Sequence, residues 1–451
     1  MTLSRLIISS CGFLIATTSI SIAGQQDQPQ SEFVLPAADA DLPGEGPVRR
    51  YEWFAKLWQT RRTAFAAEAA SQQGAVVFLG DSITQGFGPN MKDSFPGLKV
   101  ANRGISGDTT RGMLVRLQQD VLDLNPSAVV LLMGTNDLEE NARPQTIADN
   151  ISLIIASLKQ HNAEMPLILC NVFPSSETKK RSAEDIKSVN RLSAAAVKGD
   201  SQVTIVDTWT LFADENGDAK KSEFPDLLHP NKLGYSKWAN ALTPIFESLQ
   251  LLEVTDQDFV LEAGFRSLFN GKDLTGWGFL PASEAMKKGR ANWQKKDRNA
   301  PNWPLVEEPI AFTGKTQSTG GRYAAINGRL VVKQPPERRR IQQLWTTEEF
   351  QGDFTLRLEF RAMPNADSGV FIRKPQLQCR DYILAGPYRH LTSYRAQDWN
   401  ELEVEVRGKS ARCLCNGEVL EDSFKVPAVG PIGLEGDRGQ IEYRRIRIRK
   451  D

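Results

Sequence analysis

Residues 75–206 contain five short apolar runs, and this pattern constrains the fold more than any other feature of the chain. The runs are residues 75–79, 98–101, 128–133, 167–172 and 203–206. Runs this short, bounded by turn residues, are typical of fully buried parallel strands. Between the third and fourth runs, Ile147, Ile151, Ile154 and Leu158 recur at the spacing of an amphipathic helix. The alternation predicts a parallel sheet with helices on both faces, which binds ligands at the carboxyl ends of its strands.

The pattern changes near residue 264, where the helical periodicity ends. In residues 354–361, Phe and Leu alternate with Thr, Arg and Glu, and residues 402–406 repeat this alternation. The Asn416-Gly417 pair is a hairpin turn signal. The apolar positions of the last strand slip by one at Arg444-Arg445, which predicts a β-bulge. The second half is therefore predicted to be an antiparallel β-sandwich.

These two patterns divide the chain into domains. A chain of 451 residues is too long for one ordinary core, so two domains are expected. The α/β domain is predicted to cover residues 51–252 and the β-sandwich residues 264–451, with a linker at residues 253–263. Residues 24–50 are rich in Gln, Pro, Ala and Asp, a composition that predicts a flexible linker.

The first 23 residues have the pattern of an export signal. Arg5 precedes a mostly apolar stretch that ends at Ile22, and Ser21 and Ala23 form a small-x-small cleavage site. We therefore expect a periplasmic or extracellular protein cleaved near Ala23. A transmembrane anchor and lipid attachment at Cys11 are the alternatives. The many Ser and Thr argue against the first, and the few apolar residues before Cys11 argue against the second. No later segment is long and apolar enough to span a bilayer.

The charge balance limits the classes of partner. The chain has 55 basic and 55 acidic residues, so its formal net charge is zero. This removes the general electrostatic argument for nucleic acid or an anionic membrane as a partner.

The cysteines indicate structural thiols and not a metal site. Cys170 lies in an apolar run and is expected to be a buried thiol. Cys413 and Cys415 would share one face of a strand, and either could pair with Cys379 in an oxidising compartment. The sequence leaves open whether any bridge forms. The spacing matches no zinc pattern and the chain holds only three His, so we expect no metal and no other cofactor.

The groups that ester hydrolysis requires follow the predicted strands. The reaction needs a nucleophile, a base and donors for the oxyanion. Ser82 follows the first strand, and Gly107, whose backbone N–H can approach a ligand closely, follows the second. Asn136 follows the third strand and offers an amide donor, while Asp226 and His229 lie on one short loop before the last predicted helix. The sequence thus predicts one site with nucleophile, base and donors.

Four blocks of residues carry a resemblance to a known family. They are residues 80–82 (Gly-Asp-Ser), 102–109, 134–137 (Gly-Thr-Asn-Asp) and 226–230. In this order they resemble the SGNH (GDSL-like) hydrolase superfamily, in the branch near platelet-activating-factor acetylhydrolases and bacterial carbohydrate acetylesterases. The resemblance covers residues 51–252 and implies a flavodoxin-like, three-layer α/β fold.

The same resemblance implies a role for each candidate residue. Ser82 would attack the carbonyl carbon, His229 would take and return the proton, and Asp226 would orient the imidazole. The oxyanion would accept hydrogen bonds from the N–H groups of Ser82 and Gly107 and from the side-chain amide of Asn136.

The second half resembles the 3-keto-disaccharide hydrolase-like family, a concanavalin-type jelly roll. The matching stretches are residues 265–277, 367–373 and 430–434. After Arg373 the family usually continues into a strand that bears a Glu, but residues 376–382 contain none. This departure puts glycoside cleavage in doubt, and a carbohydrate-binding or docking role is at least as well supported.

The sequence therefore predicts an exported serine esterase that removes acyl groups, in particular acetyl groups, from carbohydrates. The esterase part rests on the four blocks, and the sugar part rests on the neighbouring domain alone. One alternative is a lysophospholipase or a lipid esterase like platelet-activating-factor acetylhydrolase, although no long apolar lid is visible. The others are a bifunctional protein with glycoside chemistry in its second half and a glycan-binding protein with a vestigial esterase half. The sugar and the oligomeric state stay open.

Overall fold

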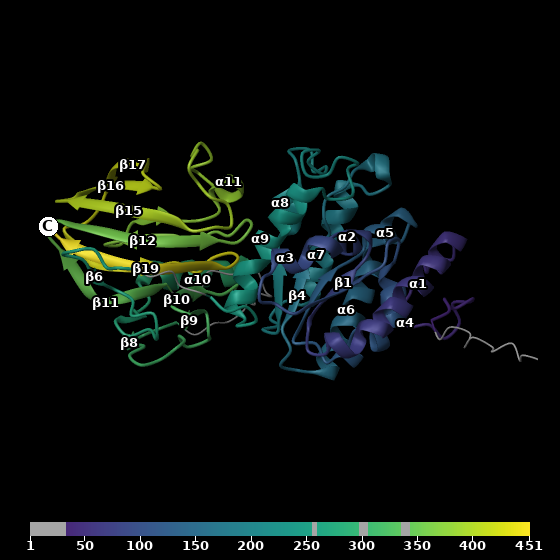
Figure 1. Ribbon diagram of the computed structural model, residues 1–451. Coiled ribbons are helices and arrows are strands. Elements are labelled where there is room, and N and C mark those ends of the chain that lie inside the picture. The colour runs from purple at the N-terminus through teal and green to yellow at the C-terminus, as the bar shows by residue number, and fades with distance from the viewer. Residues whose placement is uncertain (1–32, 255–258, 297–304, 335–342) are drawn as a thin grey trace, which may run out of the picture.

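The computed structural model describes residues 33–254, 259–296, 305–334 and 343–451 (Figure 1). The predicted export signal and part of the predicted linker at 253–263 lie outside these residues. In the described part of the chain, no helix combines the length and the apolar character that crossing a membrane requires.

The first half contains a parallel sheet with strand order β2-β1-β3-β4-β5. Its strands are β1 (Val76–Gly80), β2 (Val100–Gly104), β3 (Ala128–Leu132), β4 (Leu167–Cys170) and β5 (Val203–Val206). This is the flavodoxin-like order, and it confirms the predicted fold. The helices are α1 (Glu52–Glu68), α2 (Ser82–Gly86), α3 (Met91–Ser94), α4 (Thr110–Asp120), α5 (Thr135–Glu139), α6 (Pro144–His161), α7 (Ala183–Ala196), α8 (Thr208–Phe212) and α9 (Lys232–Ser248).

The two faces of this sheet are buried under different helices. Alternate side chains of a strand point to opposite faces, so Phe78 and Val130 pack with α8 and α9, while Val77 and Val129 pack with α4, α6 and α7. This explains why the strands read as continuous apolar runs. The switch of strand order between β1 and β3 leaves their carboxyl ends open for a site.

The second half is a sandwich of two antiparallel sheets, as predicted. One sheet has the order β17-β16-β15-β12-β19-β10-β9, with β6 beside β19, and the other has the order β14-β13-β18-β11-β7-β8. The strands are β6 (Arg266–Ser267), β7 (Trp277–Phe279), β8 (Ile310–Ala311), β9 (Tyr323–Ile326), β10 (Arg329–Val332), β11 (Leu344–Gln351), β12 (Phe354–Ala362), β13 (Gly369–Ile372), β14 (Gln376–Gln378), β15 (Asn400–Arg407), β16 (Ser410–Cys415), β17 (Glu418–Lys425), β18 (Val429–Leu434) and β19 (Ile441–Lys450). Two helices, α10 (Glu284–Lys296) and α11 (Tyr382–Ala385), interrupt them.

Local predictions in the sandwich are confirmed. Asn416 and Gly417 both have positive φ, +48° and +83°, in the turn between β16 and β17. At the predicted bulge, Arg357 pairs with Arg447 and Glu359 with Arg444, so one residue of β12 opposes two of β19. The four described cysteines are buried free thiols, and neither disulfide pairing that the sequence left open is formed.

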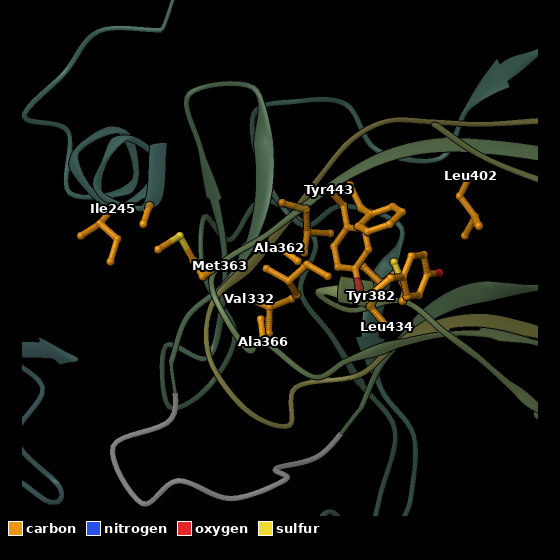
Figure 2. Close-up of a cluster of buried hydrophobic side chains, with 14 of the residues drawn as sticks. Ile245, Val332, Ala362, Met363, Ala366, Tyr382, Leu402, Leu434 and Tyr443 are labelled. Atoms are coloured by element: carbon orange, nitrogen blue, oxygen red, sulfur yellow. The ribbon is translucent and has the colours of Figure 1, made fainter. Parts of the chain in front are cut away.

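Helix α9 lies between the two domains (Figure 1). Ile245 on this helix faces Met363 of the sandwich, and both belong to one buried apolar cluster that continues into each domain (Figure 2). Near its end, Glu247 forms ion pairs with Arg329, at 2.5 Å, and with Arg361. The two domains therefore share a core and a buried charge cluster.

Residues 33–50 differ from the predicted flexible linker. They contain no helix or strand, yet Leu35 and Val48 are buried beside α1. Their backbone is held by side chains of the α/β domain: Asn150 bonds N and O of Glu45 at 3.1 and 2.7 Å, and Arg111 donates to Gly46 O at 3.0 Å. We call residues 33–50 the N-terminal arm.

Candidate active site

The turn that follows β1 places Ser82 at the sheet edge. Asp81 accepts a hydrogen bond from the N–H of Ile83 at 2.9 Å and so caps α2, whose first residue is Ser82. The turn is tight at Gly80, where a Cβ would lie 2.1 Å from Oγ1 of Thr84 and 2.6 Å from the carbonyl oxygen of Leu132. This close packing explains why a glycine ends the strand.

A loop before α9 brings His229 to Ser82. Nε2 of His229 lies 3.0 Å from Oγ of Ser82, and Nδ1 lies 2.7 Å from Oδ2 of Asp226. The other carboxylate oxygen of Asp226 accepts hydrogen bonds from the N–H groups of Leu228 and His229, at 3.0 and 2.7 Å. Ser175 donates to Leu227 O at 2.8 Å and ties the loop to the end of β4. The three residues are therefore joined in the order serine, histidine, aspartate.

The electrostatics of this loop keep Asp226 ionised. Partial burial raises its pKa, but the hydrogen bonds from His229 and Leu228 outweigh burial and lower the pKa to about 2. An ionised carboxylate can only accept, so Nδ1 of His229 must carry a proton in this contact. Nε2 is then free to accept the proton of Ser82.

Gly107 lies on the loop that follows β2. Its φ is +87°, a conformation that favours glycine, and a Cβ at this position would lie 2.6 Å from Cη2 of Trp53. The loop is tied to the nucleophile's own helix, because Gln85 on α2 accepts from the N–H of Ser106 at 2.8 Å. The sequence did not predict this hydrogen bond between Ser106 and Gln85.

Asn136 lies in the first turn of α5, beyond β3, and is buried. Its Nδ2 donates to the carbonyl oxygen of Asp108 at 3.0 Å, and its Oδ1 accepts from Arg181 at 3.2 Å. Because arginine only donates and a carbonyl only accepts, the amide orientation is fixed. Among the residues that the structure describes, the second Nδ2 hydrogen makes no hydrogen bond, so it can be donated to a ligand. Arg181 also donates to Thr135 O at 3.0 Å, and the sequence analysis missed this residue.

Buried carboxyl groups support these loops from below. Burial raises the pKa of Asp81 and of Asp137 to about 6, and that of Asp108 to about 7. Asp137 accepts from N and Oγ1 of Thr110 at the start of α4. Arg116, on the same helix, donates to Asp108 at 2.8 Å and to Gly80 O at 3.2 Å. The supporting layer therefore connects the ends of β1, β2 and β3.

The structure thus brings Ser82, His229 and Asp226 into one hydrogen-bonded set. Gly107 lies on the loop after β2 and Asn136 in the first turn of α5, and the bond from Asn136 to the carbonyl oxygen of Asp108 links these two segments. The other histidines, His161 and His390, are exposed and far along the chain from this loop. Within the described residues, no three His, Cys, Asp or Glu side chains are grouped to hold a metal ion.

Comparison with known proteins agrees with this geometry. The sequence model of the GDSL-like Lipase/Acylhydrolase family matches residues 78–237, which include Ser82 and His229. This chain carries a GDSL-like acylhydrolase domain. A second model, of the 3-keto-alpha-glucoside-1,2-lyase-like domain, matches residues 264–449. Both predicted resemblances are confirmed, and the first domain makes the protein an ester hydrolase.

Curated relatives match the acylhydrolase domain. The platelet-activating factor acetylhydrolase IB subunit alpha2 of Homo sapiens is 27% identical over 227 residues, 50% of this chain and 93% of the relative. The subunit alpha1 of Rattus norvegicus is 25% identical over 224 residues, 49% of this chain and 90% of the relative. A solved GDSL-like lipase from Bacteroides thetaiotaomicron is 27% identical, with a TM-score of 0.37, covering 41% of this chain and 97% of that one.

Proposed function

We propose that this acylhydrolase is an exported serine esterase that removes acyl groups, in particular acetyl groups, from carbohydrates. The observation that carries the esterase mechanism is the chain of contacts from Ser82 Oγ through the His229 ring to Asp226, at 3.0 and 2.7 Å. Both distances lie within the range over which a proton is transferred along a hydrogen bond.

The acylation step uses Ser82 and His229. Nε2 of His229 takes the hydroxyl proton while Oγ attacks the ester carbonyl carbon, and a tetrahedral intermediate forms. Asp226, ionised and fixed by two backbone N–H groups, stabilises the imidazolium. The imidazolium then protonates the leaving alcohol, and the acyl group stays on Ser82. Water deprotonated by His229 attacks this acyl-enzyme and releases the carboxylic acid.

The negative oxygen of each intermediate would be held by three donors. These are the N–H groups of Ser82 and Gly107 and the free Nδ2 hydrogen of Asn136. Donors that are oriented before the reaction stabilise developing charge without reorganising, and the bonds from Asn136 to Asp108 and Arg181 provide that orientation.

Two features support a carbohydrate substrate. A carbohydrate-related domain is fused to the acylhydrolase domain and shares a core with it. The N-terminal pattern of an export signal would place the enzyme where polysaccharides occur. The names of the relatives favour a second candidate, an acetylated phospholipid, so both classes enter the test.

The test uses the full chain and compares acetate release from acetylated oligosaccharides with release from a 2-acetyl ether phospholipid in mixed micelles. Chain-length preference is measured in parallel on p-nitrophenyl esters from acetate to octanoate, with Ser82→Ala as the blank. We expect a preference for acetate esters and for the sugar substrate. A larger kcat/KM on the phospholipid would replace the carbohydrate proposal with the lipid one.

A further inference from the structure

A pair of exposed aromatic rings lies beside the proposed oxyanion loop. Tyr51 and Trp53, at the start of α1, are 52% and 51% exposed, although most large apolar side chains of this domain are buried. Their rings are nearly parallel, with an angle of 13° and centroids 6.3 Å apart. Trp53 packs edge-on against the buried Phe54 at 5.7 Å, which fixes the indole from below. The two exposed rings are therefore held in place.

The indole of Trp53 contacts the loop that carries Gly107. A Cβ at Gly107 would lie 2.6 Å from Cη2 of Trp53 and 3.1 Å from Nη1 of Arg49, so only hydrogen fits between them. The loop that carries Gly107 is therefore packed against the indole. No step of the ester chemistry uses either aromatic ring.

A polar cavity of about 300 Å³ adjoins the two rings. Besides Tyr51 and Trp53 it is lined by Arg49, Glu139, Glu140, Asn141 and Lys180. The cavity thus combines an aromatic wall with hydrogen-bonding groups. A sugar ring, which has a C–H face and several hydroxyl groups, can match both parts of this lining.

The polar wall is itself ordered and is connected to Asn136. Arg49 donates to Glu140 at 2.7 Å and pairs with Glu139, and Tyr51 donates to Glu140 at 3.3 Å. Arg181 donates both to Glu139, at 2.9 Å, and to Asn136. Burial raises the pKa of Glu139, but Arg49 and Arg181 outweigh it and hold the pKa below its usual value. The Glu139 carboxylate is therefore an ionised acceptor for hydroxyl groups.

We propose that Tyr51, Trp53 and this cavity form a subsite that binds a pyranose ring of the acylated substrate. This inference rests on the proposed function and specifies which residues recognise the sugar. The C–H face of the pyranose packs on the indole of Trp53, and ring hydroxyls donate to Glu139 and Glu140. The ester on that sugar, or on its neighbour, then reaches the N–H of Gly107.

The geometry favours a sugar over the choline group of a phospholipid. A quaternary ammonium is held by aromatic rings that surround it, whereas these two rings are nearly parallel to each other. The lining cations and carboxylates balance, two of each, and Arg49 is already paired with both carboxylates. An uncharged polyol therefore fits this lining better than a phosphate does.

The experiment measures the full-length protein and its Trp53→Ala variant on two substrates in a pH-stat. One is an acetylated xylo-oligosaccharide, and the other is ethyl acetate, whose leaving group is too small to reach the subsite. We expect kcat/KM on the oligosaccharide to fall about tenfold or more relative to that on ethyl acetate, mainly because KM rises. A loss of this size is what removal of one stacking contact costs. Trp53→Phe, which keeps a flat apolar face, should recover most of the loss.

Leu153→Ala is the matched control, because it removes an exposed apolar side chain from α6 that does not line the cavity. Circular dichroism of each variant checks folding. An unchanged ratio between the two substrates in Trp53→Ala would overturn the subsite while leaving the esterase proposal intact. Failure of the wild-type protein on every acetylated glycan would instead overturn the proposed function. Both proteins are also measured on the acetylated phospholipid in mixed micelles, and a loss in Trp53→Ala confined to that substrate would assign the rings to a choline group and overturn the proposal.

Discussion

Two buried regions of the molecule, the charge cluster around Glu442 and the turn around Asp81, hold charged side chains in different ways. In the sandwich, Arg329 and Arg361 both pair with the fully buried Glu442, so buried cation and anion compensate each other. At the carboxyl edge of the parallel sheet, Asp81 and Asp137 are equally buried, yet in the described residues they bond N–H and hydroxyl groups and form no ion pair. Removing one partner of a buried ion pair leaves an uncompensated charge, whereas the carboxylates of Asp81 and Asp137 hold the backbone where α2 and α4 begin.

The sharpest test of this comparison removes the reactive groups themselves. Ser82→Ala and His229→Ala should each lower esterase turnover by about 10⁴-fold or more, because the residues act as one unit. Steady-state rates on p-nitrophenyl acetate measure the loss, and circular dichroism checks the fold. A folded Ser82→Ala protein with near-wild-type turnover would falsify the assignment.

The second test concerns Asn136. Its replacement by Ala should lower kcat by roughly 10²- to 10³-fold with little change in KM, because its amide meets charge that develops only in the transition state. If KM carried most of the change, Asn136 would be a binding residue and the proposed oxyanion site would be wrong at that position.

The third test is the pH dependence of turnover. His229 must be neutral to accept the proton of Ser82, so kcat should fall by about tenfold per pH unit on the acid side of the profile. Asp226, whose pKa is lowered to about 2, stays ionised over this range and does not contribute to the acid limb. A pH–rate profile of the wild-type protein from pH 4 to 9 tests this; a flat profile would contradict the scheme where chemistry limits the rate.

The fourth test addresses the paired charges. Glu247→Ala removes one carboxylate from the cluster around Arg329 and Arg361 and should lower the free energy of unfolding by about 1–3 kcal/mol without changing kcat. Glu348→Ala, which removes a half-exposed partner of Arg266, should cost less than about 1 kcal/mol. Urea unfolding of both variants measures the two losses of stability. A large loss of turnover in Glu247→Ala would show that the sandwich acts on the active site.

The fifth test concerns the carboxyl of Asp81, whose effect is confined to a window of pH. Its pKa is raised from 3.8 to about 6 in the folded protein, so the folded state binds more protons than the unfolded state between these values, and stability falls as pH rises through this window. The cost above pH 6 is up to about 3 kcal/mol. The free energy of unfolding of Asp81→Asn minus that of the wild-type protein should therefore be larger at pH 8 than at pH 4. Equal urea midpoints for the two proteins at both pH values would contradict this.

Local patterns in the sequence were sufficient for the parts of the fold that depend on neighbours along the chain. The apolar runs predicted the parallel strands, and the phase slip at Arg444-Arg445 predicted the bulge. Asp226 and His229 are only three residues apart, so their contact is local. Because a parallel sheet binds ligands at the carboxyl ends of its strands, Ser82, which follows the first strand, was expected at the same site. These inferences needed no knowledge of distant side chains.

Contacts between distant segments explain what the sequence analysis missed. Arg181, which orients Asn136, lies on another segment and has no motif of its own. The N-terminal arm has the composition of a flexible linker, but Arg111 and Asn150 bond its backbone, and composition does not report donors on other helices. The same holds for Trp53, an ordinary helix residue in sequence until its contact with Gly107 is seen.

That contact makes two positions on different segments subject to a single steric constraint. Any side chain introduced at position 107 would meet the indole before it met a ligand, besides occupying an unfavourable φ. A mutational library that varied position 107 alone would thus return only glycine. A library that also replaced Trp53 with smaller residues would relieve the steric clash with the indole. The unfavourable φ at position 107 would still select against other residues. Laboratory evolution of this enzyme toward bulkier esters would therefore have to pass through position 53 first.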